Sequence, residues 1–362
     1  MSTELSGHVV DKDRRPVANV KITSNGRTIG TTGGDGSFAV KLRDAARRVA
    51  VTFGARGYVA NTRIFDGRGS RGNLIVIWPT ASRVGFDPGR GLDVELGSSR
   101  IQVPADALVS SGGKKADGRA ELRFTLFDVT DPFQRAAAAG DFASRSTDGT
   151  TERLSSFGIF DLDVTDASGR RLGLRRDASV ELAVAVPPRL ARRAPKEVGF
   201  YDFDPLSGFW VPAGTFGFVP AGLTYNGSVV PFGGLHNLDE TQSVTCVTVQ
   251  VVSIWDGSGM GGFQVTAHGP QYDSYGTTDG NGFVCLLVDT GATFTVTAFG
   301  TVGATFWSSP QPPTFTAPNF SSTAEDCGDS VKCPLLGTVA VDFVVGGIAV
   351  LDAARVVPRA AT

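Results

Sequence analysis

The chain has 362 residues, of which 41% are hydrophobic and 19% charged, a composition that excludes a disordered chain. The formal net charge of −2 gives no reason to expect nucleic acid or an anionic membrane surface as a partner. At roughly 150 residues per domain, the length predicts two or three domains, each able to bury its own core.

Short runs that alternate apolar and polar residues occur from one end of the chain to the other. In chain order, the clearest runs are 20–23, 121–126, 161–164, 181–186 and 293–297. This alternation, rich in β-branched and aromatic residues, is the signal for half-buried strands. Helical patterning is limited to one short helix at 131–139 and a turn at 188–194. The pattern predicts an all-β protein with far less helix than the globular average.

One supersecondary unit occurs twice in the sequence. The segment 30–40 (GTTGGDGSFAV) matches the segment 276–286 (GTTDGNGFVCL), and each follows a strand-like run at a similar distance. Asp35-Gly36 in the first copy and Asn281-Gly282 in the second are residue pairs that supply the positive φ angles of tight hairpin turns. We infer two related β units that flank a different middle segment.

The first copy carries a recognisable set of residues, namely Gly7, Val9, Asp11, Pro16 to Val20, Gly30 to Thr32, Asp35, Gly36 and Phe38. With them, residues 4–79 resemble a carboxypeptidase regulatory-like domain, which is a transthyretin-like β-sandwich. Residues 244–345 resemble a second, more divergent copy. The resemblance implies a fold and says little about activity, since this module hosts many functions.

The middle segment contains, in order, the runs 101–109, 118–124, 127–132 and 200–211. Their order is similar to that in the ectodomain of cartilage intermediate layer proteins and related bacterial surface proteins, and to the β-sandwich of ankyrins and netrin receptors. Members of these groups are mainly extracellular matrix or surface proteins without known chemistry. The resemblance therefore implies a larger sandwich and a non-enzymatic role.

The expected architecture is three tandem β-sandwich modules at about 4–79, 80–240 and 241–346, the first and third transthyretin-like, with a loosely held tail at 347–362. No apolar stretch reaches the roughly 18 residues of a membrane span. The first residues show no apolar leader. An export signal has been removed, or export needs none, or the protein stays in the cytoplasm.

Histidines and carboxylates offer few catalytic candidates. His8, His236 and His268 fall in three different expected modules, which argues against a shared metal site or a triad. Some relatives of the middle module cleave their backbone at a His-Phe-Ser, but here Asn237 follows His236 in place of that motif. Because the nucleophile is missing, self-cleavage is not expected and His236 is interpreted as a structural linker residue.

Two acidic groups have alternative interpretations. Asp202 and Asp204 alternate on a predicted strand and could form a glycosidase pair, whereas Asp204 could instead open the turn 205–208, which we favour. Glu325, Asp326 and Asp329 offer oxygen ligands for Ca²⁺ but lack the twelve-residue loop spacing. We predict neither a metal nor a cofactor.

Three tryptophans, Trp210, Trp255 and Trp307, are candidate carbohydrate contacts. Exposed aromatic rings bind polysaccharide in some transthyretin-like sandwiches, although packing in the core is the commoner role of a tryptophan in a sandwich. The glycine-rich stretches 85–91 and 257–262 do not open a helix and are interpreted as loops rather than phosphate-binding loops.

All four cysteines lie in the expected C-terminal module. The first repeat lacks counterparts of both Cys246 and Cys285, which predicts one disulfide between them and a second between Cys327 and Cys333. Zinc is a rival, but paired C-x-x-C spacing is absent. Free buried cysteines in a cytoplasmic protein are the other alternative. Disulfides would imply an oxidising compartment.

The function that fits these observations is that of a structural or adhesive protein, extracellular or on the cell surface. Its sandwiches would act as spacers and would bind a protein or matrix partner through edge strands and end loops. The segment 241–354 holds one Lys and no Arg, as is typical of secreted or packed modules. The alternative is a carbohydrate-binding or carbohydrate-active protein that uses the tryptophans or the Asp202 and Asp204 pair.

Overall fold

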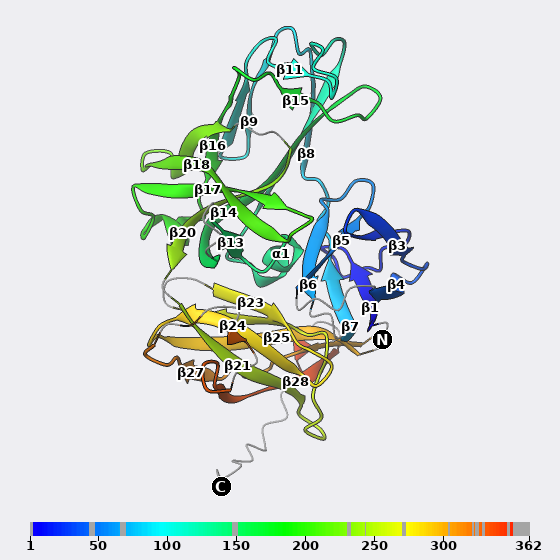
Figure 1. The fold of residues 1–362 in the computed structure, drawn as a ribbon, viewed down its shortest axis with the longest axis vertical. Coiled ribbons are helices and arrows are strands. Elements are labelled where there is room, and N and C mark those ends of the chain that lie inside the picture. Colours follow the sequence, from blue (N-terminus) through cyan, green and yellow to red (C-terminus); the bar gives the residue numbers. More distant parts are fainter. Residues whose placement is uncertain are drawn as a thin grey trace.

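The computed structural model describes residues 3–42, 48–65, 70–146, 151–229, 233–242, 244–269, 273–302, 305–320, 322, 326–327, 330–345 and 348–349. Strands make up 59% of the chain and helices 3%, which confirms the predicted all-β fold. Figure 1 shows the strands in groups that follow one another along the sequence, with the short helix labelled α1 among them. We call these groups the N-terminal, middle and C-terminal regions.

The N-terminal region comprises β1 (Thr3–Val10), β2 (Lys21–Ser24), β3 (Arg27–Thr31), β4 (Ser37–Leu42), β5 (Val49–Gly54), β6 (Asn61–Phe65) and β7 (Ser70–Val76). They form two sheets, in the orders β4-β1-β7 and β3-β2-β5-β6. Strand β1 is antiparallel to β4 and parallel to β7. Buried apolar side chains from both sheets, such as Leu5 and Phe53, meet in one cluster, so the sheets pack face to face.

The middle region comprises β8 (Ser82–Phe86), β9 (Leu92–Leu96), β10 (Ser99–Val103), β11 (Leu108–Val109), β12 (Ala120–Phe127), α1 (Pro132–Ala137), β13 (Ala143–Arg145), β14 (Thr151–Asp166), β15 (Gly173–Leu174), β16 (Val180–Ala185), α2 (Pro188–Ala191), β17 (Glu197–Asp204), β18 (Phe209–Val219), β19 (Thr224–Val229) and β20 (Gly234–Gln242). Its large sheet has the order β8-β12-β14-β20-β17-β18-β19-β16-β10-β9. Strand β13 joins it beside β14, and β11 pairs with β15 in a separate ribbon.

The C-terminal region comprises β21 (Val244–Ser253), β22 (Gln264–His268), β23 (Asp273–Thr277), β24 (Phe283–Asp289), β25 (Thr293–Val302), β26 (Thr305–Ser308), β27 (Thr314–Thr316), β28 (Leu335–Val345) and β29 (Ile348–Ala349). The main path through its sheet is β23-β22-β25-β26-β28-β21-β24. Strand β21 is antiparallel to β24 and parallel to β28, which repeats the pattern of β1 with β4 and β7.

The two copies of the sequence repeat also share their side-chain hydrogen bonds. The buried hydroxyl of Thr32 accepts from the backbone N–H of Val20 at 2.9 Å. The hydroxyl of Thr278 accepts from the backbone N–H of Phe263 at the same distance. Each hydroxyl also donates to a backbone carbonyl, at 2.8 and 2.6 Å respectively. One buried threonine therefore ties a strand to its turn in the same way in both copies.

The three regions touch one another. Strand β7 of the N-terminal region packs against β25 of the C-terminal region, and α1 of the middle region packs against β7. The main core of the middle region takes in Val59 and Leu74 from the N-terminal region and is flanked by Tyr275 from the C-terminal region. Within the described residues, no helix is long and apolar enough to cross a bilayer.

Candidate functional site

His236 lies in the middle of β20 and is 2% exposed, so its interpretation as a linker residue is wrong. The sheet register places it opposite Asp202 on β17, and its Nδ1 lies 2.6 Å from the Asp202 Oδ1. The rings of Phe160 and Phe200 pack against the imidazole. Among the described residues, the His236 Nε2 has no hydrogen-bond partner, so no hydroxyl or thiol is positioned there as a nucleophile would be.

Asp204 opens a turn, as the favoured interpretation predicted. Its carboxylate accepts from the backbone N–H of Leu206 at 2.9 Å and from that of Ser207 at 3.3 Å. Burial raises the pKa of Asp204, but the Ser207 side chain together with these backbone hydrogen bonds outweighs it and lowers the pKa below its ordinary value. A glycosidase acid requires a raised pKa, and Asp202 is already engaged by His236. The two carboxylates are therefore not arranged as a glycosidase pair.

The three candidate tryptophans have different surroundings. Trp210 is fully buried against Phe142 and Phe203, which rules it out as a carbohydrate contact. Trp307 is partly buried and packs against the core of the C-terminal region. Trp255 is 64% exposed, and its indole Nε1 donates to the Asp342 Oδ1 at 2.9 Å. Of the three, only Trp255 presents most of its ring to solvent.

The cysteines form two disulfides, but the predicted pairing is wrong. Cys246 pairs with Cys333 across 4.9 Å between Cα atoms, and Cys285 pairs with Cys327 across 5.8 Å. The sheet explains the difference. In the β21–β24 register Cys285 lies opposite Thr248, whereas the segment that leads into β28 runs along the other side of β21 and brings Cys333 to Cys246.

The acidic group considered for Ca²⁺ is only partly described. Asp326 forms an ion pair with Lys332 at 2.7 Å. Glu325 and Asp329 lie outside the described residues. Since the Asp326 carboxylate already has a cationic partner, the described contacts give no support to a calcium site there.

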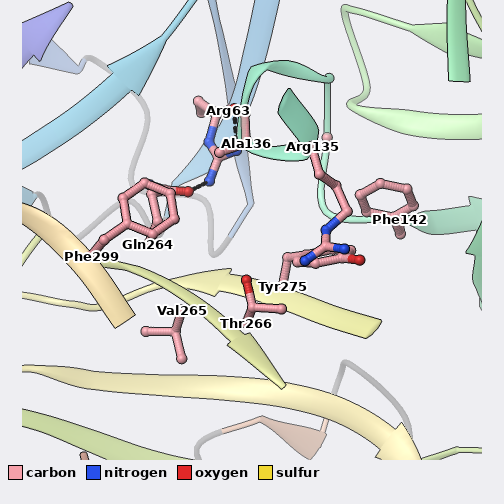
Figure 2. A pocket seen from close by; sticks show the side chains of 10 residues that line it. Arg63, Arg135, Ala136, Phe142, Gln264, Val265, Thr266, Tyr275 and Phe299 are labelled. Carbon is pink, nitrogen blue, oxygen red and sulfur yellow. Dashed lines mark hydrogen bonds between the residues drawn. The ribbon is translucent and has the colours of Figure 1, made fainter. Parts of the chain in front are cut away.

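The feature that unites the molecule is a buried junction where side chains of all three regions meet (Figure 2). Arg63 of β6 is 7% exposed and donates to the side chains of Gln264 on β22 and Thr277 on β23. It also donates to the carbonyl of Ala136 in α1 at 3.2 Å. One guanidinium therefore contacts all three regions. Burial lowers the pKa of Arg63 to about 10, so it stays charged at neutral pH.

Two more buried arginines complete the junction. The guanidinium of Arg135 in α1 lies 3.8 Å from the ring centroid of Tyr275, and its Nη1 donates to the Val129 carbonyl at 2.7 Å. Arg153 of β14 donates to the Asp141 carbonyl and to the Ser274 hydroxyl on β23. Both arginines thus connect the middle region to β23, by cation–π and hydrogen-bond contacts.

A cavity of about 10 Å³ lies in the junction, lined by Arg63, Arg135, Gln264, Tyr275 and Phe299 among others (Figure 2). This volume is close to the minimum that holds one water molecule. The cavity is therefore too small for an organic ligand, and the polar groups around it act in holding the regions together.

The pattern of residues along the chain does not predict this junction. Arg63 and Arg153 are each the sole basic residue of their strand, β6 and β14 respectively, and this was the available signal. An arginine in a strand is normally solvated, so its type alone does not distinguish a solvent-facing position from an interface.

No family model matches the chain. It is 26% identical over 226 residues to cartilage intermediate layer protein 2 of Mus musculus, a match that covers 58% of this chain and 19% of the mouse protein. The protein of the same name from Homo sapiens is 27% identical over 174 residues, which cover 44% of this chain and 15% of that protein. The chain thus spans less than a fifth of the length of these relatives and is distantly similar to them.

Two solved structures illustrate the structural comparison. BcpA, the major pilin subunit of Bacillus cereus, is 7% identical, with 94% of this chain and 99% of that chain covered and a TM-score of 0.18. The Bacillus anthracis TIE protein is 10% identical, with 95% and 51% covered and a TM-score of 0.18. Scores this low carry no argument about fold or function.

Proposed function

We propose that the protein is a non-enzymatic structural or adhesive protein, located on the cell surface or outside the cell. It would consist of three β-sandwich modules at about 4–79, 80–240 and 241–346, the first and third transthyretin-like. The observation that carries the proposal is the junction, where the Arg63 guanidinium contacts the middle and C-terminal regions at once. The distant similarity to cartilage intermediate layer protein 2 and the two disulfides support it.

The junction favours a scaffold role for a physical reason. Arg63, Arg135 and Arg153 are each at most 7% exposed, and a buried guanidinium is tolerable only while its hydrogen-bond and aromatic partners stay in place. Separation of the regions would leave these partners unsatisfied, so the three regions are held in one relative arrangement. Such a body presents its sheet edges and end loops in fixed positions, as a spacer or adhesive protein requires.

The test is whether the native protein is accessible at the cell surface and which partner it binds. Intact cells of the source organism are treated with protease, and released peptides are identified by mass spectrometry. We expect peptides from the chain to be released without lysis, and purified tagged protein to retain a partner from the cell envelope or matrix. Recovery of the chain solely from the cytosol would overturn the proposal.

A second candidate function, carbohydrate binding, is favoured by Trp255. Its ring is exposed while its Nε1 is held by Asp342, so it is a fixed apolar surface of the kind that stacks on sugar rings. A glycan array with wild type and Trp255→Ala tests this function. Phe320→Ala is a matched control, because Phe320 is an exposed aromatic residue of the same region. Glycan binding that only the Trp255 change abolishes would favour the carbohydrate function.

A further inference from the structure

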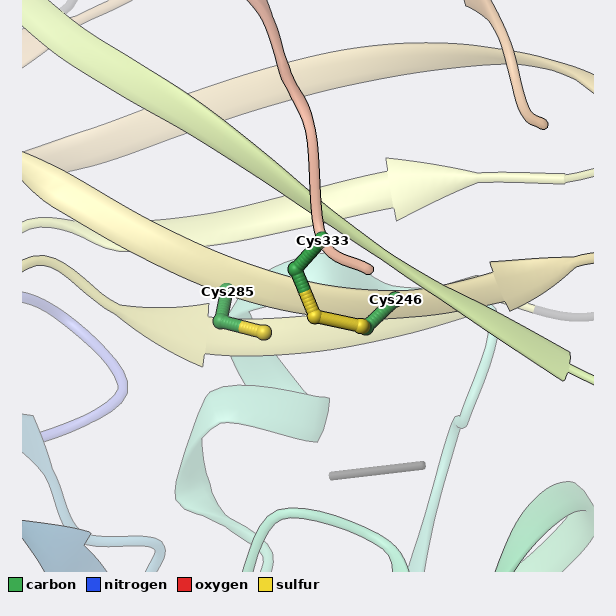
Figure 3. A group of neighbouring side chains, drawn as sticks. All are labelled: Cys246, Cys285 and Cys333. Carbon is green, nitrogen blue, oxygen red and sulfur yellow. A yellow bond between two sulfur atoms is a disulfide. The ribbon is translucent and has the colours of Figure 1, made fainter. Parts of the chain in front are cut away.

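The two disulfides are immediate neighbours. The sulfurs of Cys246, Cys285 and Cys333 all lie within 4.8 Å of one another, and Cys327 is bonded to Cys285. Figure 3 shows the Cys285 sulfur beside the bond between Cys246 and Cys333. All four cysteines of the chain therefore share one site, although they come from two strands and a connecting segment.

The sulfur positions are close to those of a tetrahedral metal site. With Zn–S bonds of about 2.3 Å, tetrahedral geometry places the four sulfurs about 3.8 Å apart. In the oxidised chain the Cys246 and Cys333 sulfurs are bonded to each other, and the Cys285 sulfur lies within 4.8 Å of both, so reduction leaves three thiols within reach of one metal ion. The hydrogen bonds between β21 and β24 fix the backbone around Cys246 and Cys285, and the Thr248 hydroxyl donates to the Cys333 carbonyl at 3.2 Å, so small side-chain rotations would suffice.

The surroundings also suit a closed thiolate site. Cys246 is fully buried and Cys333 is 2% exposed, whereas Cys285 and Cys327 are half-buried. The hydroxyl of Ser322 donates to the Cys246 sulfur at 3.1 Å, which places it as an outer hydrogen-bond partner of a metal-bound sulfur. Lys332, adjacent to Cys333, is the sole Lys or Arg between 241 and 354, and its ammonium group is paired with Asp326 at 2.7 Å.

We propose that the four cysteines form a redox-gated metal centre, present as two disulfides when oxidised and as one Cys₄ zinc site when reduced. Each disulfide takes two electrons from a reductant such as a phosphine, which becomes its oxide with an oxygen atom from water, and yields two thiols. Zn²⁺ then replaces the four thiol protons. Sequence spacing did not reveal the site, because the five residues between Cys327 and Cys333 exceed the usual spacing and the sheet supplies the other two ligands.

The experiment uses the full chain, with and without anaerobic phosphine treatment. Each form is incubated with Zn²⁺, passed through a gel-filtration column and analysed for bound metal. We expect one zinc per reduced chain and none per oxidised chain. Co²⁺ in place of Zn²⁺ should give the intense thiolate charge-transfer bands of a four-sulfur site. Zinc should also raise the Tm of the reduced chain, since binding is coupled to the folded state.

Variants separate this site from adventitious binding. Cys285→Ser should weaken zinc binding to the reduced chain by more than about 100-fold, because loss of an outer hydrogen-bond partner alone costs about 10- to 100-fold. His268→Gln removes the histidine of the same region and should leave the affinity unchanged. In the reduced wild type, zinc should protect all four thiols from alkylation together.

The proposal is overturned if reduced chains with four titratable thiols retain no stoichiometric zinc, or if zinc protects only some of the thiols. An unchanged affinity in Cys285→Ser would overturn it too. These results are read on purified protein, so they stand apart from the cellular test of the proposed function.

Discussion

The N-terminal and C-terminal regions share one framework but stabilise it differently. In both, a buried threonine, Thr32 or Thr278, holds a strand to its turn, and the first strand lies between an antiparallel and a parallel neighbour. The N-terminal region relies on its apolar core, whereas the C-terminal region adds two disulfides. The shared part is therefore turn and strand chemistry, and the covalent bonds are an addition.

The reason for the addition lies in one connection. In the N-terminal region, β6 leads to β7 through residues 66–69, whereas β26 leads to β28 through residues 309–334, whose described part contains the short strand β27. Longer connections are costlier to order, since the entropy lost on closing a loop grows with its length. Cys327 and Cys333 anchor the end of this connection to β24 and β21. The shared framework thus accommodates the longer connection 309–334, which the two disulfides attach to the sheet.

The strongest test of this difference between the two regions is to remove one disulfide of the C-terminal region. The double variant Cys246→Ala, Cys333→Ala opens a loop of 87 residues and should lower the free energy of unfolding by about 4 to 5 kcal/mol on the chain-entropy model. Denaturant unfolding measures the loss, and hydrogen exchange locates it. Peptides of β21 and β24 should lose protection before those of β1 and β4. Equal loss of protection in both regions would contradict the inference that the disulfide stabilises the C-terminal region in particular.

The next largest effect is expected at the junction. Arg63→Met removes hydrogen bonds to Gln264, Thr277 and the Ala136 carbonyl, and should destabilise the chain by about 3 kcal/mol. Because the loss falls on contacts between regions, the variant should unfold in separate steps by calorimetry. Arg27→Met, at an exposed position of β3, serves as the control and should leave the unfolding transition unchanged. A single transition of unchanged midpoint for Arg63→Met would refute the role of the junction.

Matched threonine variants test the hydrogen bonds that the N-terminal and C-terminal regions share. Thr32→Val and Thr278→Val each leave one buried backbone N–H and one carbonyl without their side-chain partner. Each should cost about 2 kcal/mol, and the two costs should agree within about 0.5 kcal/mol. Urea unfolding of both variants gives the comparison. A large cost in one repeat and none in the other would show that the framework is not equally important in both.

The smallest expected effect is a difference in how the stability of the middle region and that of the N-terminal region depend on pH. Burial, followed by the neighbouring Asp163, raises the pKa of Asp161 to about 7, so its contribution to stability is full below pH 3.8 and is lost as the pH rises towards 7. Hydrogen bonds from Ser37 lower the pKa of Asp35 in the N-terminal region, so its contribution is lost instead as the pH falls below 3.8.

Asp161→Asn tests this difference. At pH 8 the variant should be more stable than wild type by about 1 to 2 kcal/mol, because it removes a carboxylate that is costly to ionise in a partly buried site. At pH 4 the gain should vanish. Unfolding free energies across this range measure the effect, and a gain that does not depend on pH would show that Asp161 is not ionised by pH 8.

Local chemistry made part of the fold predictable. Gly36 and Gly282 adopt positive φ angles of 73° and 82°, as their Asp-Gly and Asn-Gly turns predict. The helix expected at 131–139 forms over 132–137, where Asp131 caps its first turn by accepting from the Phe133 N–H at 2.8 Å. These features depend on residues that are close together in the sequence, so a short segment of sequence is enough to predict them.

The disulfide pairing and the junction were not predictable in this way. Cys333 reaches Cys246 only because β28 lies beside β21, a neighbour relation set by the fold of the whole region. Arg63 is buried only because α1 and β22 cover it from two other regions. Both features depend on contacts between distant segments, which alternation along a single strand does not report.

The parallel strand pairs give the molecule a defined response to tension. The chain enters the N-terminal region at the start of β1 and leaves it after β7, which is parallel to β1. A pull on the two ends therefore drives these strands past each other and loads all their backbone hydrogen bonds at the same time. The C-terminal region has the same geometry in β21 and β28, and there the bond between Cys246 and Cys333 clamps the sliding pair covalently.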